Sequence, residues 1–352
     1  MSVARLKRQS SVARRRHALA IMLVTVTVLS GGAADAQLLT TPEPRAAPAE
    51  WIGLIGEYGT DERLLVSEHD GSLTVAVQWM SPELLRQSSS NVFEWPHSGV
   101  YDGAHVLFTR DVNGVANSVA IDGTVFPNRH VGPVTGGQLH ITPVRPVETL
   151  RAEALAAEPP LEPASARAPE LTELVRLDPT IKLDIRYATT NNFLGSRMYT
   201  QARAFLQRPA AEALERVSRS LRERGYGLLV HDAYRPWYVT KIFWDAAPAE
   251  KKWLVANPAN GSRHNRGAAV DLTLYYLANG TRVEMVSTYD ESTDRAFADY
   301  PGGTSLQRWH RALLRSAMEA EGFSANPQEW WHFDYRDWRE YPILNIPFEQ
   351  IR

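Results

Sequence analysis

The stretch Ser262-Arg263-His264-Asn265-Arg266-Gly267-Ala268-Ala269-Val270-Asp271 decides how the C-terminal half of this chain is organised. Gly267 permits a tight turn after His264, and the apolar residues that follow predict a strand with Asp271 on one face. Further along the chain, Glu329-Trp330-Trp331-His332 adds a second imidazole and a second carboxylate. Two imidazoles and one carboxylate could hold a catalytic metal ion, and the other carboxylate could act as a base beside it.

The three-residue spacing of Glu329 and His332 constrains where each can lie. Residues three apart on a regular strand point to opposite faces, so we expect Glu329 in the turn before the strand that carries His332. Taken separately, each motif has an ordinary alternative. His264 could be a loop histidine near a capping aspartate, and Glu329 a surface glutamate beside a histidine packed among aromatic residues.

Length and composition indicate a soluble protein of two domains. The chain has 352 residues, of which 44% are hydrophobic and 22% charged; this length suits two domains and this balance is typical of globular proteins. A formal net charge of −2 argues against nucleic-acid binding and against general attachment to a membrane surface. Without cysteine, the protein has no disulfide and no lipid anchor, and any metal site must use nitrogen and oxygen ligands.

The first 36 residues predict a cleaved signal peptide. Basic residues precede an apolar segment, Ala18–Leu29, and Ala34-Asp35-Ala36 forms a small-x-small cleavage site. The apolar segment is short for a bilayer span, which favours removal over an uncleaved anchor. We therefore expect a periplasmic or secreted bacterial protein with no transmembrane segment after cleavage.

Residues 37–50 predict a tether, and residues 51–145 a small all-β sandwich or barrel-like domain. The dipeptides Asp70-Gly71, Asp102-Gly103, Asn113-Gly114 and Asp122-Gly123 lie between β-branched apolar segments, which favours hairpins. Leu73–Trp79 alternates as a half-buried strand does. The histidines of residues 51–145 are scattered and show no catalytic pattern. The role of this domain therefore stays open between contact with cell-wall polymer, contact with a partner and simple spacing.

The remaining chain predicts a linker and then a mixed domain. Residues 146–170 are rich in Ala, Glu and Pro and indicate an interdomain linker with at most one helical turn before it. From residue 171 to 352 we expect an α+β domain, an antiparallel sheet with helices packed on one side. The expected strands are 182–187, 227–234, 268–275 and one beginning near Trp331, and the expected helices are 209–225 and the one from Leu306 to Gly322.

Several motifs of residues 171–352 together resemble the zinc D-alanyl-D-alanine dipeptidases of the vancomycin-resistance type. These motifs are Ser-x-His-x-x-Gly-x-Ala-x-Asp from Ser262, Glu329-x-x-His332, Tyr187-Ala-Thr-x-x-Asn-Phe193 and Asp232-x-Tyr234-Arg235-Pro236. The same fold group holds D-Ala-D-Ala carboxypeptidases and the Hedgehog signalling domain. The resemblance does not reach the β module or the leader.

The resemblance implies a role for each matching residue. His264, Asp271 and His332 match the ligands of one Zn²⁺ per catalytic domain, and Glu329 matches the general base. Arg235 matches the arginine that steadies the oxyanion, for which a structural ion pair is the alternative. Ser262 matches a contact to the substrate carboxylate, while Tyr187 and Asp290 match contacts to the substrate ammonium. The family usually has aromatic residues where this chain has Glu291-Ser292-Thr293-Asp294, so the shape of the pocket departs from the family pattern.

The resemblance implies hydrolysis of D-Ala-D-Ala, in cell-wall turnover or salvage, with the free dipeptide or a peptidoglycan fragment as partner. Two alternatives stand beside this function. A D,D-carboxypeptidase acting on muropeptides would use the same zinc chemistry with an open amino-side pocket. A zinc-stabilised module without turnover would bind cell wall through the β domain, but it would need neither Glu329 nor Arg235.

Overall fold

The computed structural model describes residues 42–351 apart from residues 79, 98, 100 and 130–138. The expected signal peptide and residues 37–41 of the expected tether lie outside the described residues. Within the described part of the chain, no helix has both the length and the apolar character needed to cross a membrane.

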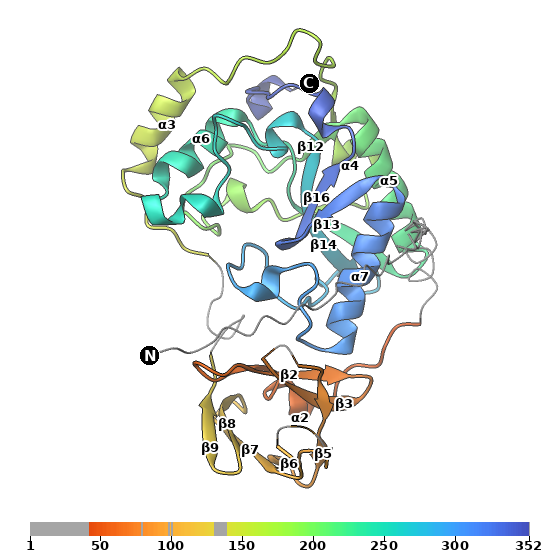
Figure 1. Cartoon of the computed structure of the whole chain (residues 1–352). Helices are drawn as coiled ribbons and strands as arrows, with labels where there is room; N and C mark the ends of the chain where they lie inside the picture. The colour runs from red at the N-terminus through yellow and green to blue at the C-terminus, as the bar shows by residue number, and fades with distance from the viewer. Residues whose placement is uncertain (1–41, 79, 98, 100, 130–138, 352) are drawn as a thin grey trace, which may run out of the picture.

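Residues 49–128, here called the N-terminal module, form two antiparallel sheets over one core (Figure 1). The first sheet has the order β1-β2-β3-β4 and the second the order β5-β6-β7-β8-β9. Apolar residues from both sheets belong to one buried cluster, as expected of facing sheets. The elements are α2 (Ala49–Ile52), β1 (Gly56–Tyr58), β2 (Leu64–His69), β3 (Ser72–Val77), β4 (Glu83–Leu84), β5 (Arg86–Gln87), β6 (Val92–Glu94), β7 (His105–Arg110), β8 (Ala116–Ile121) and β9 (Thr124–Pro127).

All four predicted hairpin dipeptides fall between strands. Asp70-Gly71 joins β2 to β3 with φ of 47° and 79°, and Asp122-Gly123 joins β8 to β9 with φ of 45° and 87°. Two successive positive φ angles define the tight hairpin turn that suits strand twist. Asp102-Gly103 and Asn113-Gly114 lie in the longer connections on either side of β7.

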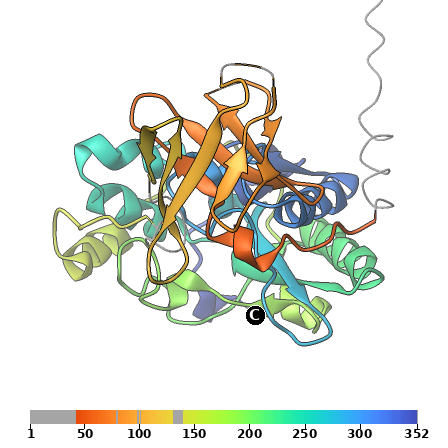
Figure 2. The ribbon, with the colours of Figure 1, turned by 90° about the horizontal axis from the view of Figure 1, so that it is seen from below.

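Strand β3 is buried on both faces, although its sequence predicts a half-buried strand. Every residue from Leu73 to Val77 is buried. Leu73, Val75 and Val77 face the core of the module. The other face of the sheet is covered by the C-terminal half, because Leu65, which pairs with Ala76, packs against the core of that half. Seen from below, the N-terminal module lies across the C-terminal half (Figure 2).

Glu68 is the main polar connection between the two halves. Its carboxylate is fully buried and accepts hydrogen bonds from the backbone N–H of Ser305 at 2.8 Å and of Gly71 at 2.6 Å. Ser305 begins helix α7 (Ser305–Ala320), so this acidic side chain sits at the positive end of the helix dipole. Tyr300 adds a hydrogen bond to Glu57, and Arg63 pairs with Asp294.

The segment expected to be a linker contains a packed helix. α3 (Val147–Ala156) buries Leu150 and Ala154 in the core of the C-terminal half and packs against α6 (Trp237–Ala246). Leu150 and Ala154 are four residues apart and therefore share one helix face. The Ala- and Glu-rich composition that suggested a linker is thus also that of a helix, and only residues after 156 run without regular structure up to β10.

The C-terminal domain contains a five-stranded sheet of order β11-β13-β14-β16-β15. Its pairings are antiparallel except for that of β11 with β13, so the expected mixed α and β architecture with an antiparallel sheet is confirmed. The further elements are β10 (Leu171–Glu173), α4 (Leu174–Leu177), β11 (Lys182–Leu183), η2 (Arg186–Ala188), β12 (Phe205–Gln207), α5 (Arg208–Arg222), β13 (Tyr226–Asp232), η3 (Ala249–Leu254), η4 (His264–Arg266), β14 (Ala269–Tyr276), η5 (Asp294–Ala296), β15 (Phe323–Asn326), β16 (Glu329–Tyr335), η6 (Trp338–Glu340) and η7 (Phe348–Gln350).

Helices α5 and α7 pack on the sheet, while α3 and α6 lie on the other side of it in Figure 1. Both sheet-packed helices lie where the sequence predicts them, and each is followed by a glycine at φ 87°, Gly225 and Gly322. The strand expected over 182–187 is wrong beyond Leu183. The Asp184 N–H still bonds to the Val230 carbonyl at 2.9 Å, and the chain then turns into η2, in which Tyr187 is buried.

Candidate active site

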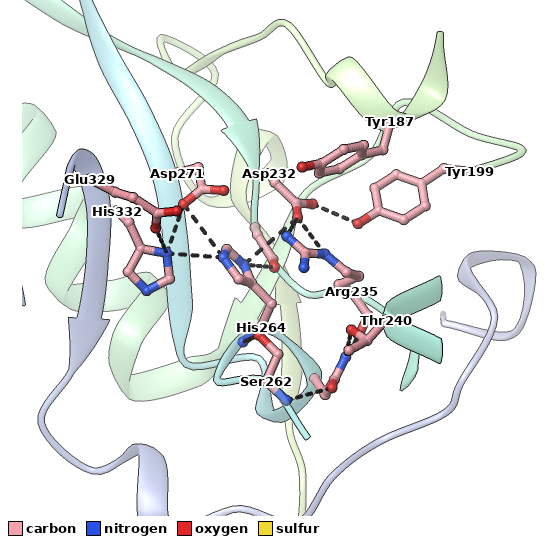
Figure 3. A network of polar contacts seen from close by, with 12 residues as sticks. Tyr187, Tyr199, Asp232, Arg235, Thr240, Ser262, His264, Asp271, Glu329 and His332 are labelled. Atoms are coloured by element: carbon pink, nitrogen blue, oxygen red, sulfur yellow. Dashed lines mark hydrogen bonds and ion pairs between the residues drawn. The ribbon is translucent and has the colours of Figure 1, made fainter. Parts of the chain in front are cut away.

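Asp271 and His332 are brought together by strand register. Asp271 of β14 lies directly opposite His332 of β16 and, on its other side, opposite Asp232 of β13. Residues opposite one another on neighbouring strands have side chains in contact. The hydrogen bond between His332 Nδ1 and Asp271 Oδ1, at 2.9 Å, follows directly from this pairing (Figure 3).

His264 reaches the same point from η4. Gly267, at φ 63°, ends this turn in the left-handed region and lets the chain enter β14. A side chain on Gly267 would also collide with Leu171, at 2.7 Å from its Cδ2. His264 Nδ1 donates to the Ala233 carbonyl at 2.7 Å, which leaves Nε2 as a lone-pair donor facing Asp271 and His332.

The three residues form a set of donors that fits a metal ion. His264, Asp271 and His332 are buried, and they are the one group of three or more such ligands found among the described residues. Their donor atoms are separated by 2.9, 3.2 and 3.4 Å. Ligands about 2.0–2.1 Å from a tetrahedral metal lie roughly 3.3 Å apart, so the site matches without rearrangement.

Carboxylates and a hydroxyl outside this set orient the ligands. His332 Nε2 donates to Asp334 Oδ1 at 3.0 Å, which turns Nδ1 toward the site, and Asp334 is itself paired with Arg263 at 3.1 Å. Tyr289 donates to Asp271 Oδ2 at 3.1 Å, which leaves Oδ1 for the two imidazoles. Such outer hydrogen bonds fix the ring orientation and raise ligand basicity.

We expect metal binding to release about one proton near neutral pH, because an imidazole must be neutral to ligate. Burial lowers the pKa of His332, but its hydrogen bonds with Asp271 and Asp334 outweigh burial and raise the pKa to about 10. The metal-free site therefore holds a proton on His332 up to that pH. Apparent metal affinity should rise about tenfold per pH unit until then. Calorimetry in buffers of different ionisation enthalpy measures this release, and a heat that does not depend on the buffer would contradict it.

Glu329 lies beside the donor set, but not in the turn where the sequence places it. It is the first residue of β16 and pairs with Asn326, beyond an irregularity in which residues 330–332 of β16 have no partner on β15. This irregularity lets its carboxylate share a side with His332, whose Nδ1 is 3.9 Å from Glu329 Oε2. Asn326 Nδ2 donates to the same oxygen at 2.9 Å. Desolvation in the cleft raises the pKa of Glu329, as does the nearby Asp271 carboxylate, while His332 and His264 lower it.

Arg235 is both a member of an ion pair and a wall of the cleft. Its Nε and Nη2 donate to Asp232 Oδ2 at 2.9 and 2.7 Å, and Tyr199 donates to Asp232 Oδ1 at 2.7 Å. The guanidinium also lies 5.2 Å from the centre of the Tyr187 ring (Figure 3). Held on one edge by Asp232, this permanent cation is fixed in a buried position next to the donor set.

One cavity of about 320 Å³ contains all eight residues predicted for the site. Tyr187 donates to Asp290 Oδ2 at 3.4 Å, so these two residues form one end. Desolvation, with the Asp271 and Glu329 carboxylates, raises the pKa of Asp290 well above its usual range. Ser262 Oγ accepts from the His264 N–H at 3.3 Å, and its own proton stays available for a ligand. The volume lies at the small end of ligand pockets.

Glu291, which departs from the family pattern, braces the loop that carries Asp290. It is buried, pairs with Arg295 at 3.1 Å and accepts hydrogen bonds from Thr288 and Thr293. The loop is thus held by polar contacts at the positions where the family usually has aromatic residues.

Sequence reasoning assigned no role to Asp232, Tyr289, Asp334 or Asn326. Asp334 could have been found, because it lies two residues after His332 on the same strand face. Asp232 was quoted in a motif, but its pairing with Arg235 depends on the bend after β13. The contacts of Tyr289 and Asn326 depend on loop geometry that no local pattern encodes.

Comparison with known proteins matches the same half of the chain. The family described as D-ala-D-ala dipeptidase matches residues 167–348. The D-alanyl-D-alanine dipeptidase of Escherichia coli (strain K12) is 33% identical over 179 residues, which cover 51% of this chain and 91% of that protein. The protein of the same name from Enterococcus faecium is 34% identical over 186 residues, covering 48% of this chain and 92% of that protein.

Among solved structures, the one titled "Structure of the LdcB LD-carboxypeptidase reveals the molecular basis of peptidoglycan recognition" aligns with 55% of this chain and 80% of that chain. The sequence identity is 17% and the TM-score is 0.29, too low to establish a shared fold.

Proposed function

The chain belongs to the D-ala-D-ala dipeptidase family, and from that premise we propose that it hydrolyses the free D-alanyl-D-alanine dipeptide with the help of one Zn²⁺. The observation that carries the proposal is the convergence of the His264, Asp271 and His332 donor atoms beside Glu329 and Arg235 in one small cavity. A peptidase needs each of these parts, and residues distant in sequence supply them together.

A bound zinc ion would lower the pKa of the attacking water and polarise the scissile carbonyl. His264, Asp271 and His332 would hold the ion. Glu329 would take the proton of the water and pass it to the leaving amine, a task for which its raised pKa is suited. Arg235 would donate to the oxygen on which negative charge develops.

Substrate recognition would use both charged ends of a dipeptide. Asp290, next to the Tyr187 hydroxyl, would pair with the ammonium group, and binding of that cation would favour the ionised form of Asp290. Ser262 would donate its free hydroxyl proton to the carboxylate. A non-catalytic zinc module would require neither the general base nor the oxyanion donor.

Export to the periplasm or the cell exterior, and contact of the N-terminal module with cell wall, belong to the same proposal. An exported enzyme would meet D-Ala-D-Ala released from peptidoglycan rather than the cytoplasmic pool. The basic and apolar order of residues 1–36 supports export.

The proposal is tested by assaying the purified protein on D-Ala-D-Ala before and after removal of metal. We expect hydrolysis of the dipeptide, loss of activity with a chelator and its return when Zn²⁺ is added, because His264, Asp271 and His332 hold the ion on which the water depends. Ninhydrin detection of released D-alanine measures the rate. Hydrolysis that is unchanged in fully metal-free protein would contradict the metal mechanism, and a zinc-loaded protein inactive on the dipeptide would contradict the substrate.

A further inference from the structure

Residues 139–144, here called the strap, run from Leu139, which lines the cavity, toward α3. Leu139 N–H donates to the Asp290 carbonyl at 2.8 Å, Ile141 N–H to that of Phe193 at 2.8 Å, and Val144 N–H to that of Ala246 at 3.0 Å. Lys251 Nζ adds a bond to the His140 carbonyl at 3.2 Å. The strap is therefore tied to the C-terminal domain at four residues, of which Asp290 and Phe193 also line the cavity.

The strap contributes a wall to the cavity at its Asp290 end. The Leu139 side chain lines the same cavity as Tyr187, Asp290 and the three metal-ligand candidates, and it packs against the main core. Ile141, two residues further on, is 3% exposed and anchors the strap. Asp290 itself is held at φ 59°, in the left-handed region, with its carbonyl turned to the strap.

We propose that the strap is a specificity element that closes the amino-side end of the substrate site and so restricts the enzyme to free dipeptides. This inference rests on the proposed function, in which Asp290 and Tyr187 hold the substrate ammonium. A residue attached to that nitrogen would lengthen the substrate at the Asp290 end of the cavity, where Leu139 forms part of the lining.

The strap is a feature of this chain outside the family region. It precedes residues 167–348, which the family matches, and the relatives align over about nine tenths of their own length with only half of this chain. The strap therefore adds a wall from outside the shared catalytic domain. It also gives the N-terminal half a direct contact with the substrate site.

The test compares the zinc-loaded wild-type protein with Leu139→Ala on three substrates: D-Ala-D-Ala, N-acetyl-D-Ala-D-Ala and L-Lys-D-Ala-D-Ala. We expect the wild type to prefer the free dipeptide strongly in kcat/KM. Leu139→Ala should reduce that preference by about tenfold or more, mainly by raising the rate on the longer substrates, as a steric wall predicts. Because Asp290 is intact in both proteins, the change in preference isolates the strap from charge recognition.

Val144→Ala is the matched control, because Val144 lies on the strap with an exposed side chain and should leave the preference unchanged. Melting temperatures of both variants separate a local effect from unfolding. Should Leu139→Ala fail to fold, Leu139→Val tests the same wall, since a shorter apolar side chain removes part of the wall and keeps part of the packing. A wild type that cleaves the tripeptide as fast as the dipeptide, or a folded Leu139 variant with wild-type preference, overturns the inference. Failure of the wild type on all three substrates contradicts the proposed function itself.

Discussion

Replacing Glu329 with alanine is expected to lower kcat on D-Ala-D-Ala by about 10²–10⁴-fold, the range for loss of a positioned general base. Its carboxylate stands 3.9 Å from His332 Nδ1, beside the metal-ligand candidates, and desolvation raises its pKa, which makes it a better proton acceptor. Among the described residues, no other carboxylate occupies that position. Asp271 is directed to the imidazoles, and Asp290 lies at the Tyr187 end of the cavity.

Glu329→Gln separates the proton-transfer role from packing, since it keeps the shape and the Asn326 contact but cannot take a proton. It should lose as much activity as the alanine variant, with zinc content and melting temperature near wild type. Glu284, an exposed glutamate outside the cavity, provides the matched control as Glu284→Ala. A fully metallated Glu329 variant that retained more than about a tenth of the wild-type kcat would exclude this role.

Replacing Arg235 with alanine is expected to lower kcat by about 10²–10³-fold, as does removal of an oxyanion donor elsewhere. It should also cost about 3–5 kcal/mol of unfolding free energy, because it leaves the buried Asp232 carboxylate without its cation. Steady-state kinetics and urea denaturation at the same pH measure the two effects separately.

Arg235→Lys distinguishes the catalytic role from the structural one. Lysine supplies a charge to Asp232, so much of the stability should return. A single ammonium cannot hold Asp232 and also present a second fixed donor to the cavity, so most of the loss in kcat should remain. Recovery of both stability and kcat with lysine would show that Arg235 serves only as an ion pair.

The sequence predicted elements whose signals are local. The helices at 208–222 and 305–320 have periodic apolar faces and terminal glycines, and the hairpins at Asp70-Gly71 and Asp122-Gly123 have the residues their turns require. Burial of β3 on both faces was missed because it depends on a neighbour that no local pattern reveals. The helix at 147–156 was missed because its Ala- and Glu-rich sequence was assigned to a linker, although both residues are strong helix formers.

The candidate site was predictable where strand alternation and motif order determine it. His264, Asp271 and His332 share a cavity as expected, and the Asp271–His332 register explains why. Glu329 was expected in the turn before the strand, but it is the first residue of β16, and three residues of β16 without a partner on β15 separate it from the regular pairing. The strap was not anticipated, since residues 139–144 match no motif and their contacts depend on where the fold places them.

Glu68 beneath helix α7 has a consequence for how this chain can be divided. The family matches residues 167–348, but the core of the C-terminal half also includes residues that come before residue 167. Cutting at that boundary would strip the first turn of α7 of its buried anion, expose apolar surface covered by Leu65 and Ala76, and remove Leu150 and Ala154 from the interior. The region that the family matches therefore depends for its packing on residues that precede it in this chain.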